Sequence, residues 1–254
     1  MPPTLRIATY NIHKGFSQFN RRMVVHELRE HLRALDADIV FLQEVQGLHS
    51  GHAERHDTWP DEPQHEFLAA DVWRNTAYGR NVVYDLGHHG NAILSRYPIV
   101  ASHNQDVTHL RFERRGLLHC AIEVPQLAKP LHCVCVHLSL FGRSRSRQLD
   151  ALASRLEAIV PADAPLIIAG DFNDWRNRAH DLLAERMGLA EVFTDQAGRP
   201  QRSYPSTMPM LRLDRIYIRG FEVTGADVHC GRPWSKISDH AALSAQLTPI
   251  AAGQ

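Results

Sequence analysis

Short apolar runs that end in polar residues recur along the chain. The four clearest runs occupy residues 5–13, 38–45, 131–138 and 166–169. Their length, and the alternation of apolar with polar residues in the first of them, predict β-strands. Each run ends at or beside a side chain that is capable of chemistry, namely Asn11, Glu44, His137 and Asp171.

Amphipathic segments between these runs predict helices. Residues 22–35 carry apolar side chains at helical spacing: Val24, Leu28, Leu32 and Leu35. A second helix is predicted around Leu149, Leu152, Leu156 and Ile159, and others at 65–73 and 178–187. Further strands are predicted at 76–84, 91–96, 99–110, 116–124, 211–218, 221–229 and after His240, with a long loop at 46–64 and a turn at 87–90. No repeat or linker interrupts the series, so we expect a single domain over residues 1–254.

Composition narrows the class of protein. The chain is 44% apolar and 22% charged, which is typical of a soluble globular protein. Its formal net charge is zero, so no overall field attracts it to nucleic acid or to anionic membranes. Any anionic substrate must therefore be held by local charge or by a metal ion.

The four cysteines predict a reduced, cytoplasmic protein. Cys133 and Cys135 share one face of a predicted strand, whereas Cys120 and Cys230 stand apart, and no CxxC motif occurs. The amino-terminal residues run directly into a strand without the pattern of a signal peptide, and no apolar run is long enough for a transmembrane segment. We infer no obligate protein partner.

Histidine is abundant, with 17 residues, but its spacing does not predict zinc. Six histidines fall between His49 and His89, without an HExxH motif or Cys/His ligand spacing. Surface and loop positions are the simpler interpretation.

The polar residues at predicted strand ends form the candidate site. A glutamate such as Glu44, at the end of an apolar run, is costly to bury unless it is paired or binds a cation, although an ordinary edge charge is the alternative. Asp171 and Asn173 bring an acid and an amide to one strand end, which an Asx-type turn would also explain. The full set is Asn11, Glu44, Asn91, His137, Asp171, Asn173, Asp214, Asp239 and His240. Its oxygen-rich chemistry favours Mg²⁺ or Mn²⁺ over zinc and suits hydrolysis of a phosphate ester.

Two arginine-rich segments are candidates for contacting phosphate. Residues 111–115 end in Arg115, and residues 141–148 carry Arg143, Arg145 and Arg147 before a predicted helix. Guanidinium groups and free N–H groups at a helix start bind anions. A solvated turn and a solvated first helical turn are equally good interpretations.

Several of these residues lie in motifs that, taken in order, resemble a known superfamily. The motifs are Thr9-Tyr-Asn11, Leu42-Gln-Glu44-Val, Gly90-Asn91-Ala-Ile-Leu-Ser-Arg96, Val136-His137-Leu, Gly170-Asp171-Phe-Asn173, Leu213-Asp214-Arg-Ile and Ser238-Asp239-His240. They resemble the endonuclease/exonuclease/phosphatase superfamily, in particular its small, single-domain bacterial members. The resemblance covers residues 5–247 and implies a four-layer α/β sandwich, in which two mixed sheets pack face to face with helices outside.

The resemblance also implies roles. Glu44 resembles the principal Mg²⁺ ligand, with Asn11 beside it and Asp239 as a ligand or near neighbour of the metal. Asp171 resembles the residue that orients or deprotonates water, and His240 and Asp214 resemble a His–Asp pair; either Asp171 or His240 could be the base. Asn173 and His137 resemble donors to the phosphoryl group, and Asn91 a residue near the site. Tyr78 and Tyr84 are candidates for a tyrosine at the phosphate.

These matches imply a metal-dependent hydrolase of phosphate esters, and three functions remain open. The first is a phosphodiesterase that acts on nucleic acid, of endonuclease type. The second applies the same chemistry to a phospholipid or a small phosphorylated metabolite. The third is a binding module without catalysis. The neutral charge argues against extensive tracking along DNA. The segment with Arg143, Arg145 and Arg147 is compact and lacks the longer insertion expected of an abasic-site endonuclease.

Overall fold

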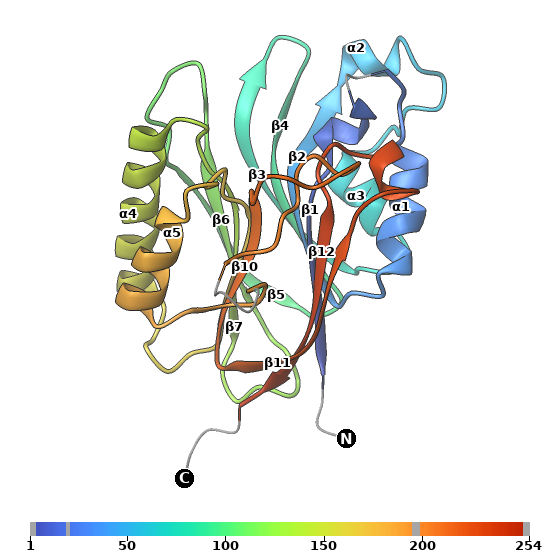
Figure 1. Cartoon of the computed structure of the whole chain (residues 1–254). Helices are drawn as coiled ribbons and strands as arrows, with labels where there is room; N and C mark the ends of the chain where they lie inside the picture. The colour runs from blue at the N-terminus through green and yellow to red at the C-terminus, as the bar shows by residue number, and fades with distance from the viewer. Residues whose placement is uncertain (1–3, 19–20, 195–198, 251–254) are drawn as a thin grey trace.

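Two β-sheets packed face to face form the centre of the molecule, and helices cover their outer surfaces (Figure 1). The computed structural model describes residues 4–18, 21–194 and 199–250. Within these residues each sheet has six strands, in the orders β11-β12-β1-β2-β4-β3 and β5-β6-β7-β8-β10-β9. The predicted four-layer α/β sandwich is confirmed.

The first sheet supplies Asn11 from the end of one strand and Glu44 from the middle of another, which continues to His49 although a loop was expected from residue 46. Its strands are β1 (Leu5–Asn11), β2 (Ile39–His49), β3 (Asn75–Tyr84), β4 (Gly87–Ser95), β11 (Phe221–His229) and β12 (Ala242–Pro249). Strands β1 and β2 are parallel, and Asn11 is the Cα partner of Gln43. The carboxyl end of β1 therefore lies next to Glu44.

The second sheet brings three of the other candidates together. Its strands are β5 (Ile99–Asp106), β6 (Gly116–Ile122), β7 (Leu131–His137), β8 (Leu166–Asp171), β9 (Ala190–Glu191) and β10 (Asp214–Arg219). Asp171 at the end of β8 is the Cα partner of His137 on parallel β7 and of Asp214 on antiparallel β10. Three chemically active side chains thus share one edge.

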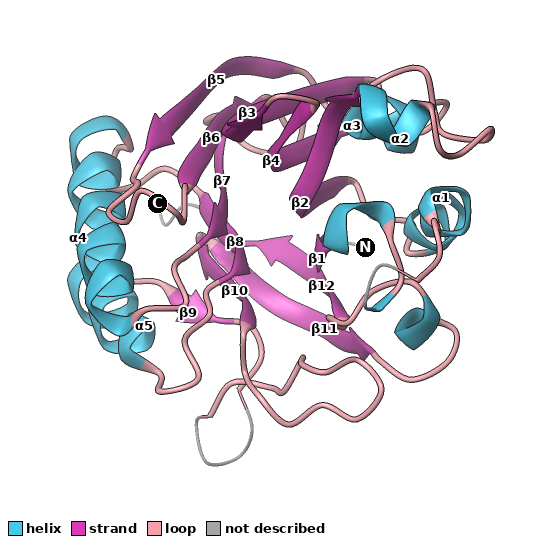
Figure 2. Cartoon of the chain, turned by 90° about the horizontal axis from the view of Figure 1, so that it is seen from above, coloured by secondary structure: helices cyan, strands magenta, loops and turns pink. Residues whose placement is uncertain are grey.

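Helices close the outer faces of both sheets (Figure 2). On the side of the first sheet lie α1 (Val25–Ala34), α2 (Ser50–Ala53), α3 (Gln64–Ala69) and the short helices η1 (His13–Gly15) and η4 (Trp234–Lys236). On the side of the second lie α4 (Gly142–Ile159), α5 (Arg178–Asp181) and the π-helical turn η3 (Leu182–Arg186). The leucines predicted to share one helix face are buried in α4, namely Leu149, Leu152 and Leu156.

The largest apolar cluster lies between the sheets. It contains inward-facing residues of both, among them Ile7, Phe41, Ile93, Cys133 and Ile167. Cys135 belongs to the same cluster, which confirms that Cys133 and Cys135 share a face. The four cysteines are free, and Cys230 alone among them is exposed. Separate clusters pack α1 and α4 against the outer faces, so the edge with the polar strand ends rests on a packed core.

Some predicted elements differ from the structure. Residues 87–90 were expected to form a turn, but they are the first residues of β4, because the chain reverses earlier, at Asp85 and Leu86. Asp214 begins β10 and does not lie in mid-strand. Helix α4 begins at Gly142 and includes the arginines expected before it. Among the described helices, none is long and apolar enough to cross a bilayer.

Candidate active site

A cleft of about 270 Å³ opens where β7 and β8 end and β10 begins. This end of the sandwich is seen from above in Figure 2. The polar residues that line the cleft are Glu44, Arg115, His137, Asp171, Asn173, Tyr204, Asp239 and His240. Its apolar lining consists of Leu140, Trp175, Leu211 and Leu213. Most residues that were predicted from the sequence therefore meet in one place.

Asp171 lies at the centre of this group and is almost fully buried. Its Oδ1 accepts a hydrogen bond from the Asn173 backbone N–H at 2.9 Å, and its Oδ2 accepts one from Asn11 Nδ2 at 3.2 Å. The Nε2 atoms of His137 and His240 lie 3.6 and 3.8 Å from the same Oδ2. Burial and the nearby Asp214 carboxylate raise the pKa of Asp171, against the opposing charge of His240.

His240 and Asp214 form the predicted His–Asp pair. His240 Nδ1 lies 2.9 Å from Asp214 Oδ2 and 3.2 Å from Oδ1, and both residues are buried. The carboxylate fixes the proton on Nδ1 and leaves Nε2 facing Asp171 and the cleft. Burial alone would lower the pKa of His240, but the carboxylates of Asp214 and Asp171 raise it above its ordinary value.

Glu44 reaches the cleft from the strand β2 and is paired with a cation. Its backbone adopts a positive φ of 56°, at an irregularity in the pairing of β2 with β4. Its Oε2 lies 3.5 Å from Lys14 Nζ. Burial alone would raise the pKa of Glu44, but the positive charges of Lys14 and His13 bring it below its ordinary value. Glu44 is therefore an anion that can attract a cation to the cleft.

Asp239 approaches from the other side of Asn11. Ser238 Oγ donates to the Asn11 carbonyl at 2.7 Å, which ties this loop to the end of β1. Asp239 Oδ1 lies 3.2 Å from His13 Nδ1. Burial of the Asp239 carboxyl group disfavours its ionised form. The hydrogen bond with His13 outweighs this effect, so the pKa of Asp239 lies below its ordinary value. Two ionised carboxylates thus line one part of the cleft. The buried Asn11 amide does not line it, and its Oδ1 accepts a hydrogen bond from the His13 backbone N–H at 3.2 Å.

These donors fit a hard divalent cation. Glu44, Asp239 and Asn11 offer oxygen atoms, and both carboxylates are balanced in this structure by side chains that are or can become positive. Oxygen ligands of this kind suit Mg²⁺ or Mn²⁺. Ligand atoms of Asp171, Asp214 and His240 also lie within 4.8 Å of one another. In this group Nδ1 of His240 is engaged by a hydrogen bond to Asp214, so Nε2 is the ring nitrogen that could serve as a ligand there.

The predicted phosphate-binding arginines differ in position. Arg115 lines the cleft, where its Nε donates to the Leu138 carbonyl at 3.3 Å. Arg143 and Arg147 are exposed near the start of α4 and do not line it, and Arg147 contacts His109. Arg145 is buried between them. Contact of Arg143 and Arg147 with substrate stays a prediction.

Asn91 joins the two sheets beside the cleft and does not line it. Its Nδ2 donates to the carbonyls of Gly116 and Cys135 at 3.1 and 3.3 Å, while its buried Oδ1 has no hydrogen-bond partner. Its contact with substrate also stays a prediction. Asn173, by contrast, lines the cleft, with its Nδ2 donating to the Leu138 carbonyl at 3.0 Å.

Sequence reasoning missed three residues of the site. His13 and Lys14 both have positive φ, 45° and 58°, which turns the chain after β1 back toward Glu44 and Asp239. Tyr204 lines the cleft, with its ring centroid 5.0 Å from that of His240. The tyrosines considered from the sequence lie elsewhere: Tyr78 bonds His88, and Tyr84 bonds Gln46. Lys14 directly follows a recognised strand end, a usable signal, whereas Tyr204 carries none.

The histidine-rich loop forms an aromatic cluster outside the cleft lining. The rings of His49 and His52 stack at 3.7 Å, and His52 lies 4.9 Å from Phe16 and 4.8 Å from Trp59. Burial lowers the pKa of His52 to about 4. A neutral, stacked imidazole of this kind packs as part of the fold.

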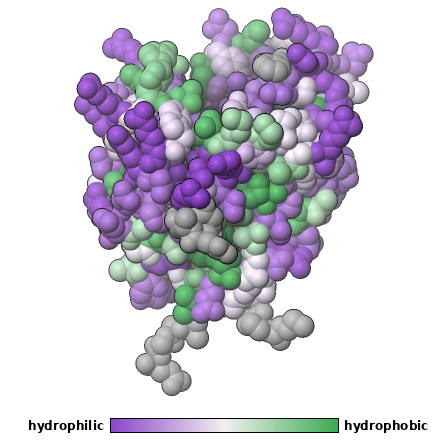
Figure 3. Space-filling view, in the orientation of Figure 1, coloured by the Kyte–Doolittle hydropathy of each residue, from purple (hydrophilic) through white to green (hydrophobic). Residues whose placement is uncertain are grey.

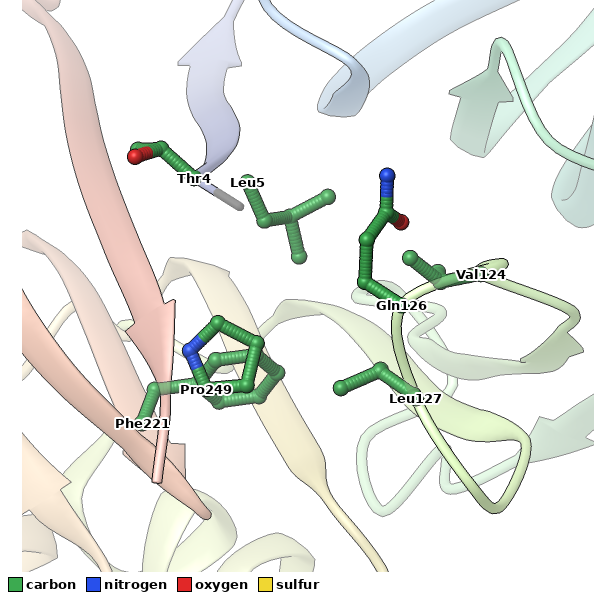
Figure 4. Close-up of a pocket in the computed structure, with 7 residues that line it drawn as sticks. All are labelled: Thr4, Leu5, Val124, Gln126, Leu127, Phe221 and Pro249. Carbon is green, nitrogen blue, oxygen red and sulfur yellow. The ribbon is translucent and has the colours of Figure 1, made fainter. Parts of the chain in front are cut away.

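A second hollow lies at the opposite end of the sandwich (Figure 4). It holds only about 10 Å³ and is lined mainly by apolar residues, among them Leu5, Val124, Leu127, Phe221 and Pro249. Such a volume suffices for about one water molecule. This hollow is therefore part of the packing between the two sheets and does not serve as a ligand site.

Comparison with known proteins places this geometry in a family. The Endonuclease/Exonuclease/phosphatase family model matches residues 8–240. The Escherichia coli (strain K12) protein named "Uncharacterized protein YbhP" is 47% identical over 244 residues, 96% of either chain. Two solved structures are similar in fold. The endonuclease/exonuclease/phosphatase from Beutenbergia cavernae has a TM-score of 0.74 and 22% identity, over 97% of this chain and 72% of its own. The human Nocturnin catalytic domain with bound sulfate has a TM-score of 0.74 and 20% identity, over 98% and 96%.

Proposed function

Because the chain belongs to the endonuclease/exonuclease/phosphatase family, we propose that it is a phosphodiesterase that depends on Mg²⁺ or Mn²⁺. One observation carries the proposal. The pair His240–Asp214 and the carboxylate of Asp171 face the same cleft as the ionised Glu44. A cleft with acid–base groups and an anionic cation site has the parts that hydrolysis of a phosphate ester needs.

Asp171 and His240 are the groups that handle protons in this proposal. Burial raises the pKa of Asp171 toward values at which a carboxylate can take a proton from water. His240 is held positive by Asp214 and Asp171, so its Nε2–H can donate to a phosphoryl oxygen. Asn11 and the Asn173 backbone N–H bond the Asp171 oxygens and fix the carboxylate in place.

The phosphate is held by donors around the acid–base pair. Arg115 contributes a permanent positive charge to the cleft, and His137 and Asn173 contribute neutral donors. Burial and neighbouring positive groups lower the pKa of His137 well below its ordinary value, so this imidazole is neutral. Such preorganised donors stabilise the negative charge that develops on phosphoryl oxygens.

Glu44, Asn11 and Asp239 would hold the cation. When bound there, a divalent metal ion supplies positive charge for the phosphoryl oxygens and for the leaving group. In this proposal, side chains of the protein carry out each proton transfer. No residue of the cleft requires a purely binding function to explain its presence.

We favour a phosphodiester over a phosphomonoester as the substrate. A monoester carries more negative charge, and Arg115 is the one arginine that lines the cleft among the described residues. The apolar residues Leu140, Trp175, Leu211 and Leu213 leave room for an uncharged group on a second ester oxygen. A nucleic acid, a phospholipid and a small diester all satisfy this chemistry.

Turnover of two chromogenic esters tests the proposal. We expect hydrolysis of bis-p-nitrophenyl phosphate in Mg²⁺ or Mn²⁺, little hydrolysis of p-nitrophenyl phosphate, and none of either in chelator. Preference for the monoester would make the protein a phosphatase. Hydrolysis that persists in chelator, or no hydrolysis with either metal, would refute a metal-dependent phosphodiesterase.

A further inference from the structure

Three segments on the α4 side of the cleft concentrate positive charge at the surface. They are residues 109–115, 139–147 and 173–178. Their exposed arginines are Arg111, Arg114, Arg143, Arg147, Arg176 and Arg178. The acids in these segments are Glu113 and Asp174, and both are buried. In a chain with 28 basic and 28 acidic residues, this local excess gives one surface a positive potential.

Large apolar side chains project from the same segments. Phe112 is 77% exposed, Leu140 54%, Phe141 51% and Trp175 43%. The rings of Phe112 and Phe141 meet edge to face at 5.8 Å. Figure 3 shows hydrophobic surface at the upper left, over the end of the molecule at which α4 begins. We call these four residues and the six exposed arginines the apolar–arginine platform.

Buried charges hold this platform in place. The Glu113 carboxylate accepts hydrogen bonds from the Leu140 backbone N–H at 3.0 Å and from the Ser139 hydroxyl. Arg145 Nη1 donates to the Ser139 and Leu140 carbonyls at 2.9 and 3.2 Å, and its guanidinium lies 5.1 Å from the Trp175 ring centroid. These contacts hold the exposed apolar side chains in position, although their contact with water is unfavourable.

The platform continues into the cleft. Leu140 and Trp175 belong to both, so a surface docked on the platform would bring its phosphate groups to Arg115 and His137. Apolar residues are also exposed on the chain segment that forms the opposite wall, namely Met208, Met210 and Leu211. Leucine and methionine offer no ring on which a base could stack. The rings of Phe112, Phe141 and Trp175 could also stack on bases, but those of Phe112 and Phe141 pair edge to face, and the exposed apolar residues opposite them are aliphatic. Aliphatic side chains on both sides of the cleft, combined with arginine, therefore favour a lipid surface over a nucleic-acid strand.

We propose that the apolar–arginine platform docks on an anionic phospholipid bilayer and presents the phosphodiester of a membrane lipid to the cleft. The choice of substrate rests on the proposed phosphodiesterase function, whereas docking does not. Phe112, Phe141 and Leu140 enter the interfacial region, and the arginines contact phosphate groups. Each arginine near an anionic surface strengthens such binding, and salt weakens its contribution.

Sedimentation with vesicles tests docking in chelator, where turnover does not contribute. The whole chain is mixed with vesicles of phosphatidylglycerol and phosphatidylethanolamine, or of phosphatidylcholine alone. We expect binding to the anionic vesicles that weakens in salt. The double variant Phe112→Ser/Phe141→Ser should bind roughly tenfold or more weakly, because it lacks the two phenyl groups whose transfer from water into the bilayer favours binding.

A matched control removes exposed apolar residues from the other end of the sandwich. Val100→Ser/Val223→Ser, at positions 52% and 42% exposed, should bind vesicles as the wild type does. Thermal unfolding confirms that both double variants are folded. Equal binding by the phenylalanine variant, or no binding of the wild type to anionic vesicles, would overturn the proposal.

Two further outcomes distinguish membrane docking from nucleic-acid binding and from the proposed phosphodiesterase function. If the wild type ignores vesicles but binds a single-stranded oligonucleotide through Phe112 and Phe141, the platform is a nucleic-acid surface and the proposal is wrong. If the wild type binds anionic vesicles through these residues yet hydrolyses no diester with metal, docking stands and the proposed phosphodiesterase function fails.

Discussion

Nε2 of His240 lies 3.8 Å from Oδ2 of Asp171, while the other ring nitrogen is held by Asp214. The imidazole therefore faces the one carboxylate that the end of β8 delivers to the cleft. Replacing it in His240→Ala should lower kcat for bis-p-nitrophenyl phosphate by about 10²–10⁴-fold, the usual contribution of a positioned acid or base. The Michaelis constant should change little.

The variant Asp214→Asn tests the orientation of the His240 imidazole while the ring itself is kept. The amide can still bond Nδ1 but does not fix the same tautomer, so kcat should fall while the protein stays folded. Added imidazole should restore part of the activity of His240→Ala and none of that of Asp214→Asn. Full kcat in His240→Ala would remove this histidine from the mechanism.

Lys14 occupies the position of a competitor for the cation. Its Nζ lies 3.5 Å from Glu44 Oε2, so a metal ion at Glu44 must displace or tolerate the ammonium group. Lys14→Met should lower the Mg²⁺ concentration for half-maximal activity on the order of fivefold, because two unit charges about 4 Å apart in water interact by about 1 kcal/mol.

The control for this variant is Lys129→Met. Lys129 pairs with Asp163 on the surface and does not line the cleft. Its substitution should leave the metal requirement unchanged. An unchanged or higher Mg²⁺ requirement in Lys14→Met would contradict competition and assign Lys14 to the substrate.

Arg215 stabilises the loop that follows Asp171. It is fully buried, and its guanidinium bonds the Asp174 carbonyl, Asn177 and the Tyr217 hydroxyl, and lies 3.4 Å from Glu191 Oε2. Arg215→Met leaves the buried Glu191 without its cation and should lower the free energy of unfolding by about 3–5 kcal/mol. Urea unfolding measures this change.

A second substitution tests whether the loss comes from the unpaired acid. Arg215→Met/Glu191→Gln removes both charges, so it should recover part of the stability of Arg215→Met. A double variant that is less stable than Arg215→Met would show that Glu191 is satisfied by other contacts and that the prediction is wrong.

The sequence predicts the strand ends of this site well, because each combines an apolar run with a polar terminus. Glu44, His137 and Asp171 stand out for this reason. Strands β1, β7 and β8 are found close to their predicted positions, whereas β2 continues past Glu44 to His49, so the prediction that it ends there is wrong. The pairing of those strands into two facing sheets does not follow from periodicity, since the alternation of side chains in one strand says nothing about its neighbours. The resemblance to a family supplied that arrangement.

The parts that were not predicted depend on chain reversals and on helix phase. Lys14 reaches Glu44 only through positive φ angles, and Tyr204 reaches the cleft through an irregular segment. Three arginines alternate before Leu149, but only Arg145 turns inward, because α4 begins seven residues earlier than the apolar pattern indicates. One helical turn thus decides which arginine supports the cleft and which two stay exposed.

A pair of histidines on the second sheet predicts the response to acid. His119 Nε2 lies 2.9 Å from His132 Nδ1, and burial lowers the pKa of His119 to about 4 and that of His132 below its ordinary value. His119 is therefore neutral in the folded protein near pH 6. The unfolded chain binds more protons between pH 6.5 and about 4, so their contribution to stability is lost as the pH falls through this range.

His119→Gln/His132→Asn should therefore show a smaller loss of stability between pH 6.5 and 4 than the wild type, measured by urea unfolding. Ser102→Ala is the control, because Ser102 is exposed on the neighbouring strand β5 and its substitution removes no titratable group. Its pH dependence should follow the wild type. Identical slopes in all three proteins would contradict the prediction.

The most direct test of the proposed active site is Mn²⁺ binding by calorimetry without substrate. The ion is expected at Glu44, while Asp214 is engaged by the imidazole of His240. Glu44→Gln should weaken binding about tenfold or more, as loss of a metal-site carboxylate does, whereas Asp214→Asn should bind Mn²⁺ as the wild type does. The reverse result, with binding lost in Asp214→Asn and kept in Glu44→Gln, would place the metal among Asp171, Asp214 and His240 and contradict the account.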